Sequence, residues 1–142
     1  MRAARARVLG APAGAVWEVV AVPELLPRWW PGVERVEDVD LAGFTQVHRT
    51  RKGGTVRADF RVERRDPPHA LVWVQLLEGT PFERLLAASE VAIALEPEGG
   101  GTRVALEVRQ SWRGVGRLGT PLARRASRRR LDEALDGLAA LV

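Results

Sequence analysis

The sequence is short of the side chains that carry covalent and metal chemistry. Its 142 residues include no Cys, no Tyr, one Met and two His, and Lys52 is the single lysine beside 21 arginines. The absence of Cys excludes a disulfide framework, a thiolate nucleophile and a Cys-based zinc site, and the absence of Tyr excludes a phenolic acid. No uncharged stretch approaches the roughly 18 residues of a membrane-spanning helix, and no signal-peptide pattern follows the N-terminus. We therefore expect a cytoplasmic protein with no integral membrane association.

The positive charge of the chain is concentrated in one segment. The formal net charge is +4, but residues 117–130 contain six arginines and no acid, so the remainder of the chain carries −2. The hydrophobic content of 46% excludes a disordered chain. The length predicts a single domain over residues 1–142. Any function assigned to the protein must account for the arginine-rich segment.

Hydrophobic periodicity predicts a mixed α and β fold. Alternation over residues 4–8, with Ala4 and Val8 on one face, predicts a first strand, and two short helices are expected after it, over 13–22 and 24–29. Six further strands, joined by hairpin-length turns, are expected over 33–39, 44–51, 55–65, 70–77, 82–96 and 102–112. A long final helix follows, with Thr120 as its cap. A curved antiparallel sheet must cover its apolar face, and the last helix is the only large cover available.

The element order, with the letters APAGAVW opening the first helix, resembles the Bet v 1-like or START-like helix-grip superfamily. The closest local match is to its bacterial polyketide cyclase/dehydrase and lipid transport (SRPBCC-type) branch, over residues 23–33, PELLPRWWPGV. The resemblance covers nearly the whole chain. It implies an α+β helix-grip fold, in which a curved seven-stranded antiparallel sheet wraps around a long C-terminal helix and encloses an apolar cavity. Members of the superfamily bind lipids, sterols, hormones or polyketides there, and some catalyse cyclisation or dehydration.

Aromatic and polar side chains on the expected inner face are candidates for the cavity wall. Trp29 and Trp30 lie between the short helices, where they either give a ligand aromatic contact or cap one end of the core. Gln110 shares an apolar strand face and either orients a ligand or reaches water at the strand end. Both faces of the strand over 70–77 are apolar, so the sequence leaves open which one points inward. The lining candidates outside the arginines are Trp29, Trp30, His48, Phe60, Trp73, Gln110, Trp112 and Ser127.

The final helix predicts arginines at the cavity. At 100° per residue, the leucines over residues 131–138 define a buried stripe. Extended toward the N-terminus of the helix, the stripe passes through Ser127 and Arg124, with Arg128 at its edge. Arginines there would hold a carboxylate, sulfate or phosphate head group. A bend near Pro121 would instead turn both arginines to solvent.

Binding is better supported than catalysis. His48 shares a strand face with Phe44 and Gln46 and is the one candidate base, but no acid partner is evident. His69 follows two prolines in a turn, and carboxylates would have to supply most ligands of any metal, so we expect no metal and no cofactor.

We expect binding of a small hydrophobic and acidic ligand such as a lipid or polyketide, and leave open whether the binding serves transport or sequestration. We expect no nucleic acid partner, and a homodimer is left open. One alternative is a polyketide cyclase/dehydrase-type enzyme that uses the same cavity. The other is an anionic-surface binder, of nucleic acid or a membrane, that acts through the arginine-rich helix.

Overall fold

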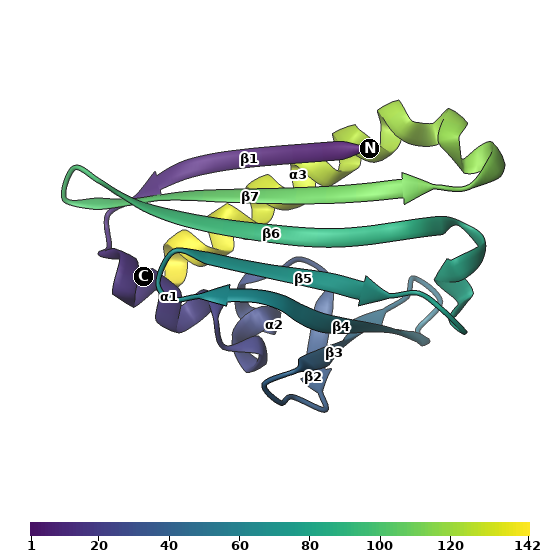
Figure 1. Ribbon diagram of the computed structural model, residues 1–142, viewed down its shortest axis with the longest axis horizontal. Coiled ribbons are helices and arrows are strands. Elements are labelled where there is room, and N and C mark those ends of the chain that lie inside the picture. Colours follow the sequence, from purple (N-terminus) through teal and green to yellow (C-terminus); the bar gives the residue numbers. More distant parts are fainter.

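The computed structural model describes residues 1–142, except for the side chain of Val115. Seven strands form one antiparallel sheet in the order β1-β7-β6-β5-β4-β3-β2 (Figure 1). The strands are β1 (Arg2–Leu9), β2 (Val33–Glu37), β3 (Gly43–Arg49), β4 (Thr55–Asp66), β5 (Ala70–Leu76), β6 (Leu86–Glu98) and β7 (Gly101–Trp112). Strands β2 to β7 form a meander, and β1 pairs with β7. The predicted seven-stranded antiparallel sheet is confirmed.

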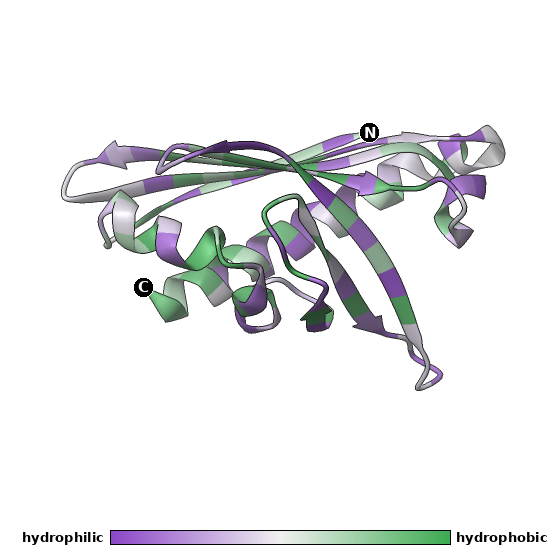
Figure 2. Ribbon diagram, turned by 60° about the horizontal axis from the view of Figure 1, so that its bottom comes forward, coloured by the Kyte–Doolittle hydropathy of each residue, from purple (hydrophilic) through white to green (hydrophobic). Residues whose placement is uncertain are grey.

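All helices lie on one side of the curved sheet (Figure 2). They are α1 (Ala13–Val20), α2 (Leu26–Trp29) and α3 (Thr120–Leu141), with the 3-10 turns η1 (Pro23–Leu25), η2 (Pro81–Arg84) and η3 (Gly114–Gly119). Helix α3 crosses behind the sheet in Figure 1 and covers its apolar face, as predicted. None of these helices is both long enough and apolar enough to cross a membrane.

The core fills the end of the sheet that lies next to α1 and α2. The side chains of Leu131, Leu135 and Leu138 on α3 are no more than 1% exposed. Helix α2 lies directly against α3 at Gly137, where an added Cβ atom would lie 2.9 Å from the Cα of Trp29. A side chain at this position would force the two helices apart, so glycine is required by the close approach.

Strand β1 is predicted correctly, but the alternating apolar residues that indicate it, among them Ala4 and Val8, are exposed. Ala3 and Leu9 are buried, whereas Val8 is 53% exposed. Arg5 and Arg7 share the inner side with Ala3 and Leu9, because each reaches a carboxylate on α3. The shortest distances are 3.3 Å from Arg5 to Asp132 and 2.6 Å from Arg7 to Asp136. These two ion pairs join the edge of the sheet to the helix.

Several predicted boundaries differ from the structure by one or two residues, and two further differences have a clear physical reason. The strand expected from residue 82 begins at Leu86, because Phe82 follows Pro81 into the turn η2, where Thr80 accepts a hydrogen bond from the Phe82 N–H. Thr120 is the first residue of α3 and not its cap, because the chain already turns through η3 and Gly119 takes the cap position.

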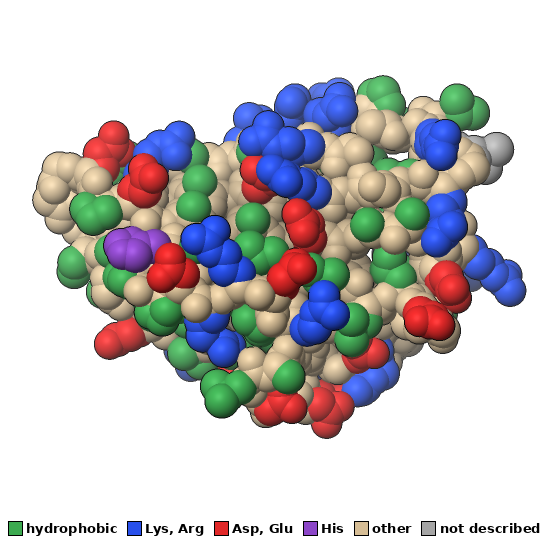
Figure 3. Space-filling view, viewed as in Figure 1, with side chains coloured by type: hydrophobic (Ala, Val, Ile, Leu, Met, Phe, Trp, Pro, Cys, Tyr) green, Lys and Arg blue, Asp and Glu red, His purple; other side chains and the backbone are tan. Residues whose placement is uncertain are grey.

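Strands β5 and β6 pair along only part of their length. The ladder runs from Ala70 opposite Ala94 to Val74 opposite Glu90. Beyond that point, residues 86–89 of β6 pair with β7 alone. The sheet is therefore divided at the end that lies far from α1, and the face of the molecule is hollowed there (Figure 3).

Candidate functional site

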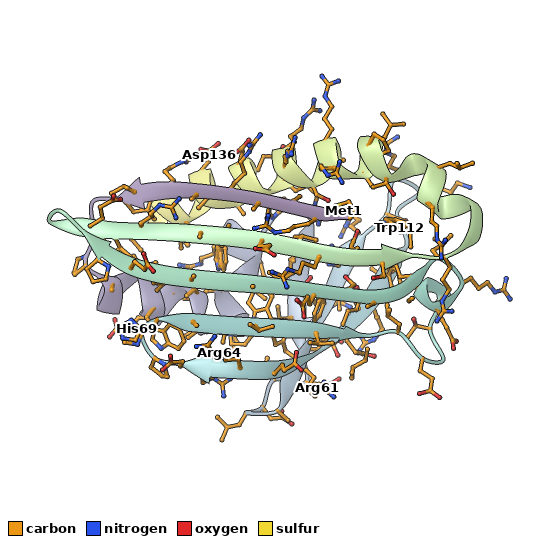
Figure 4. The ribbon with its side chains drawn as sticks, turned by 45° about the horizontal axis from the view of Figure 1, so that its top comes forward. Met1, Arg61, Arg64, His69, Trp112 and Asp136 are labelled. Atoms are coloured by element: carbon orange, nitrogen blue, oxygen red, sulfur yellow. The ribbon has the colours of Figure 1, made fainter. Side chains whose placement is uncertain are left out.

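A cavity of about 400 Å³ lies between the inner face of the sheet and α3. Its volume falls within the range of roughly 300–1,000 Å³ that is usual for small-molecule sites. Trp112 lies at one end of the cavity, where β7 meets η3 (Figure 4). His69 lies at the opposite end of the sheet. Most of the wall is apolar or aromatic, and includes Trp30, Phe60, Phe82, Leu85, Val91 and Trp112.

Three neighbouring strands change from apolar to polar side chains at this cavity. The inward residues of β5 are apolar until Gln75, and those of β7 are apolar from Val104 until Gln110. The inward residues of β6, followed back toward its start, are apolar until Ser89. The Nε2 of Gln110 donates to the Oγ of Ser89 over 3.4 Å. The inner face thus has a packed apolar end and a polar strip at the cavity wall.

Strand β3 adds a second polar pair, His48 and Gln46. The Nε2 of His48 lies 2.9 Å from the Oε1 of Gln46, which is buried. Burial lowers the pKa of His48 below its ordinary value, and the positive charge of Arg130 lowers it further, against a backbone hydrogen bond with Gly32 that raises it. At neutral pH the imidazole is therefore uncharged.

Arg130 supplies the positive charge at this edge of the cavity. Its Nη2 donates to the carbonyl of Pro31 over 3.1 Å, which joins α3 to the turn after α2. The other N–H donors of the guanidinium are left for a ligand or water. No Asp or Glu is present among the described residues that line the cavity.

Arg124 and Arg128, the predicted head-group contacts, lie outside this lining. The Nε of Arg124 donates to the carbonyl of Arg2 over 3.3 Å, and Arg128 is exposed. Both border a depression on the outer surface together with Arg5. The physical reason is the position of β1, which runs along the side of α3 that carries these two arginines, while the cavity lies on the side of Arg130.

The other predicted lining residues divide into two groups. Trp29 and Trp73 are 3% and 1% exposed and belong to the core. The Trp73 ring packs edge-on against that of Trp30, with centroids 5.8 Å apart, so it supports the wall from behind. The predicted residues that the structure brings together around the cavity are Trp30, His48, Phe60, Gln110, Trp112 and Ser127.

Trp112 also presents a buried donor without a partner. Its indole Nε1 is shielded from solvent and has no hydrogen-bond partner among the described residues, and the same holds for Trp29. A buried N–H group without a partner costs about 1–3 kcal/mol. Since a water molecule does not reach this nitrogen, Trp112 contributes its ring and not its N–H to the cavity wall.

The cavity lies next to a depression on the outer face of the sheet, at the place where β5 and β6 separate. A depression of about 660 Å³ on that face shares Gln75, Leu86 and Ser89 with the cavity wall. Gln75 and Ser89 of the polar strip therefore separate the cavity from this depression.

Sequence reasoning missed several wall residues. Arg130 falls beside the ideal buried stripe of α3, and no periodicity signal identifies it. The sequence did contain a signal for Gln75 and Ser89. Each is a polar residue at the end of a row of large inward side chains, and both rows end on the same side of the sheet as the row that ends at Gln110. Phe82 and Leu85 belong to η2 and its end, which the sequence predicts as strand. In the described part of the chain, no three His, Asp or Glu side chains form a metal-binding group.

A curved antiparallel sheet that grips a long C-terminal helix, with a cavity between them, defines the helix-grip class of folds. The family model for polyketide cyclase / dehydrase and lipid transport proteins matches residues 1–142, and the chain belongs to this family. A search of curated proteins finds no match.

Solved structures confirm the fold at low sequence identity. A protein from Chromobacterium violaceum is 18% identical with a TM-score of 0.78, over 99% of this chain and 96% of that one. A conserved protein from Geobacillus kaustophilus is 15% identical with a TM-score of 0.79, over 99% and 93%. A START superfamily protein from Mycobacterium smegmatis is 11% identical with a TM-score of 0.76, over 98% and 94%.

Proposed function

We propose that the cavity binds a small ligand with an apolar body and an anionic head group. The observation that carries this proposal is the make-up of the wall, which is mostly apolar, with Arg130 at one edge and no Asp or Glu among its described residues. Apolar walls take up the body of such a ligand, and a guanidinium group holds a carboxylate through two hydrogen bonds. The family description, which includes lipid transport, supports this class of ligand.

The polar strip gives the cavity a second means of recognition. Gln75, Ser89 and Gln110 lie on the sheet wall of the cavity. A ligand with a carbonyl or hydroxyl group along its body can satisfy these side chains. Ligands of the lipid and polyketide classes offer such groups.

The test compares decanoate with decanol by titration calorimetry. Loss of a hydrogen bond to a charged group costs about 1.5–3 kcal/mol, so Arg130→Gln lowers decanoate affinity roughly tenfold to a hundredfold and leaves decanol affinity unchanged. Arg128→Gln, the matched control, keeps the affinity for both ligands.

Equal decanoate affinity in wild type and Arg130→Gln would show that Arg130 does not hold the head group. A loss of affinity in Arg128→Gln alone would return that role to the helix face first predicted. Native mass spectrometry of the freshly purified protein then identifies any ligand that the cavity retains.

Enzymatic use of the same cavity, as a cyclase or dehydratase, is the second candidate. It is favoured by the lowered pKa of His48, which leaves a neutral imidazole at the wall that can accept a proton. The expected result is that His48→Gln abolishes turnover of a polyketide substrate while binding is retained. Equal turnover in both proteins would remove His48 from the reaction.

A further inference from the structure

The outward face of α3 combines exposed leucine with arginine. At 100° per residue, Leu122, Arg125 and Arg129 fall within about 60° of one another, on the side of the helix opposite to the buried leucines. Leu122 is 75% exposed, and Leu118, just before the helix, is 85% exposed. Figure 3 shows arginine side chains gathered over α3 with apolar side chains beside them. Exposed leucines beside a cluster of like charges are an unusual feature for a surface that meets only water.

Arg125 and Arg129 of this face, with Arg124 and Arg128 on the side of the helix next to β1, border a depression of about 520 Å³ on the outer surface. Its one acidic neighbour, Asp132, already pairs with Arg5 at 3.3 Å. Four guanidinium groups around one depression fit a phosphate group, which arginine binds through paired hydrogen bonds.

We propose that this surface, formed by Leu118, Leu122, Arg124, Arg125, Arg128 and Arg129, docks on an anionic lipid bilayer. The arginines contact lipid phosphates, and the two leucines enter the boundary between head groups and acyl chains. Residues 117–130 carry +6 while the rest of the chain carries −2, so the molecule has one side that such a bilayer attracts. Nucleic acid would explain the arginines but would leave both leucines in water.

The docking surface lies next to the cavity. The turn η3, which carries Leu118, packs on Trp112 of the cavity wall. The Nε of Arg117 donates to the Trp112 carbonyl over 3.4 Å, and a Cβ added at Gly116 would lie 3.3 Å from the Trp112 ring. Docking therefore brings that end of the cavity to the bilayer. The proposal itself depends on the surface leucines and arginines and not on what the cavity holds.

The experiment measures sedimentation of the protein with vesicles of phosphatidylcholine, with and without phosphatidylglycerol. We expect binding only to the anionic vesicles, and weaker binding as salt rises. Each arginine near an anionic surface adds to the attraction, so Arg125→Glu with Arg129→Glu lowers the partition coefficient by at least about tenfold. Leu118→Ser with Leu122→Ser lowers it by about tenfold, since both leucines leave water on docking.

Matched controls come from other parts of the surface. Arg103→Glu changes an exposed arginine of β7, and Leu41→Ser changes a leucine that is 83% exposed between β2 and β3; neither alters the partition coefficient. Circular dichroism melting curves verify that every variant is folded. A loss in Arg103→Glu as large as that in the α3 variants would overturn the proposal. So would vesicle binding that is insensitive to the leucines, or strong retention on DNA with no binding to vesicles.

Discussion

The two halves of α3 have opposite surroundings. From Leu131 onward, four residues are at most 1% exposed and two aspartates pair with β1. From Thr120 to Arg130, no described side chain is buried, and Ser127 and Arg130 line the cavity. The comparison teaches that one continuous helix stabilises the fold with its C-terminal half and is available for binding with its N-terminal half.

The largest expected effect comes from truncating one leucine in each half. Leu138→Ala removes a fully buried side chain and lowers the free energy of unfolding by about 2–5 kcal/mol. Leu122→Ala removes an exposed one and changes it by less than about 0.5 kcal/mol. Urea denaturation of both variants measures the difference. Similar losses in the two variants would break the comparison.

A smaller effect is expected from pH at the N-terminal half of α3, where Arg130 lies near His48 of β3. Burial and the positive charge of Arg130 lower the pKa of His48 in the folded protein. The histidine of the unfolded chain has an ordinary pKa of about 6.5, so as pH falls the unfolded chain binds a proton before the folded protein does. Stability contributed by the neutral imidazole is therefore present above about pH 6.5 and is lost on acidification through the folded-state pKa. Urea denaturation should show that the free energy of unfolding falls more between about pH 8 and about pH 5 in wild type than in His48→Gln. Parallel profiles would show that His48 titrates alike in both states.

The smallest expected effect is at the ion pairs that join the C-terminal half of α3 to β1. Arg7 and Asp136 are 37% and 69% exposed, and exposed pairs contribute about 0.2–1 kcal/mol. Arg7→Ala should lower the free energy of unfolding within that range, and raising the salt concentration should reduce the difference from wild type. A loss of free energy of unfolding equal to that of Leu138→Ala would mean that these ion pairs, and not burial, stabilise the C-terminal half of α3.

The sequence predicts the fold well because the signals are local. Period-two alternation and hairpin turns lead to the correct strand number and to the meander of β2 to β7, and the leucine stripe of α3 identifies its buried face. It is harder to predict which face of β1 points inward. The apolar side chains of Ala4 and Val8 suggest that theirs is the inner face, but in the structure the inner face is that of Arg5 and Arg7. Those arginines point inward because aspartates more than 120 residues away lie opposite them. No local pattern contains that information.

The cavity is only partly predictable for a related reason. Helical angles place Arg124 on the buried stripe, but they do not tell on which side of α3 the sheet edge lies. The structure puts β1 on the side of Arg124 and Arg128, and the cavity on the side of Arg130. Which arginine lies at the cavity is therefore decided by tertiary packing and not by periodicity.

The early separation of β5 and β6 has a consequence for kinetics. No ladder bond joins these strands beyond Val74 and Glu90, so a molecule that passes beside Gln75 and Ser89 breaks no hydrogen bond between them. Openings of such a slit belong to local fluctuations, on the order of microseconds to milliseconds, and are far more frequent than global unfolding. A ligand that entered there would exchange on the timescale of these local openings, while the packed end of the molecule keeps its hydrogen bonds throughout.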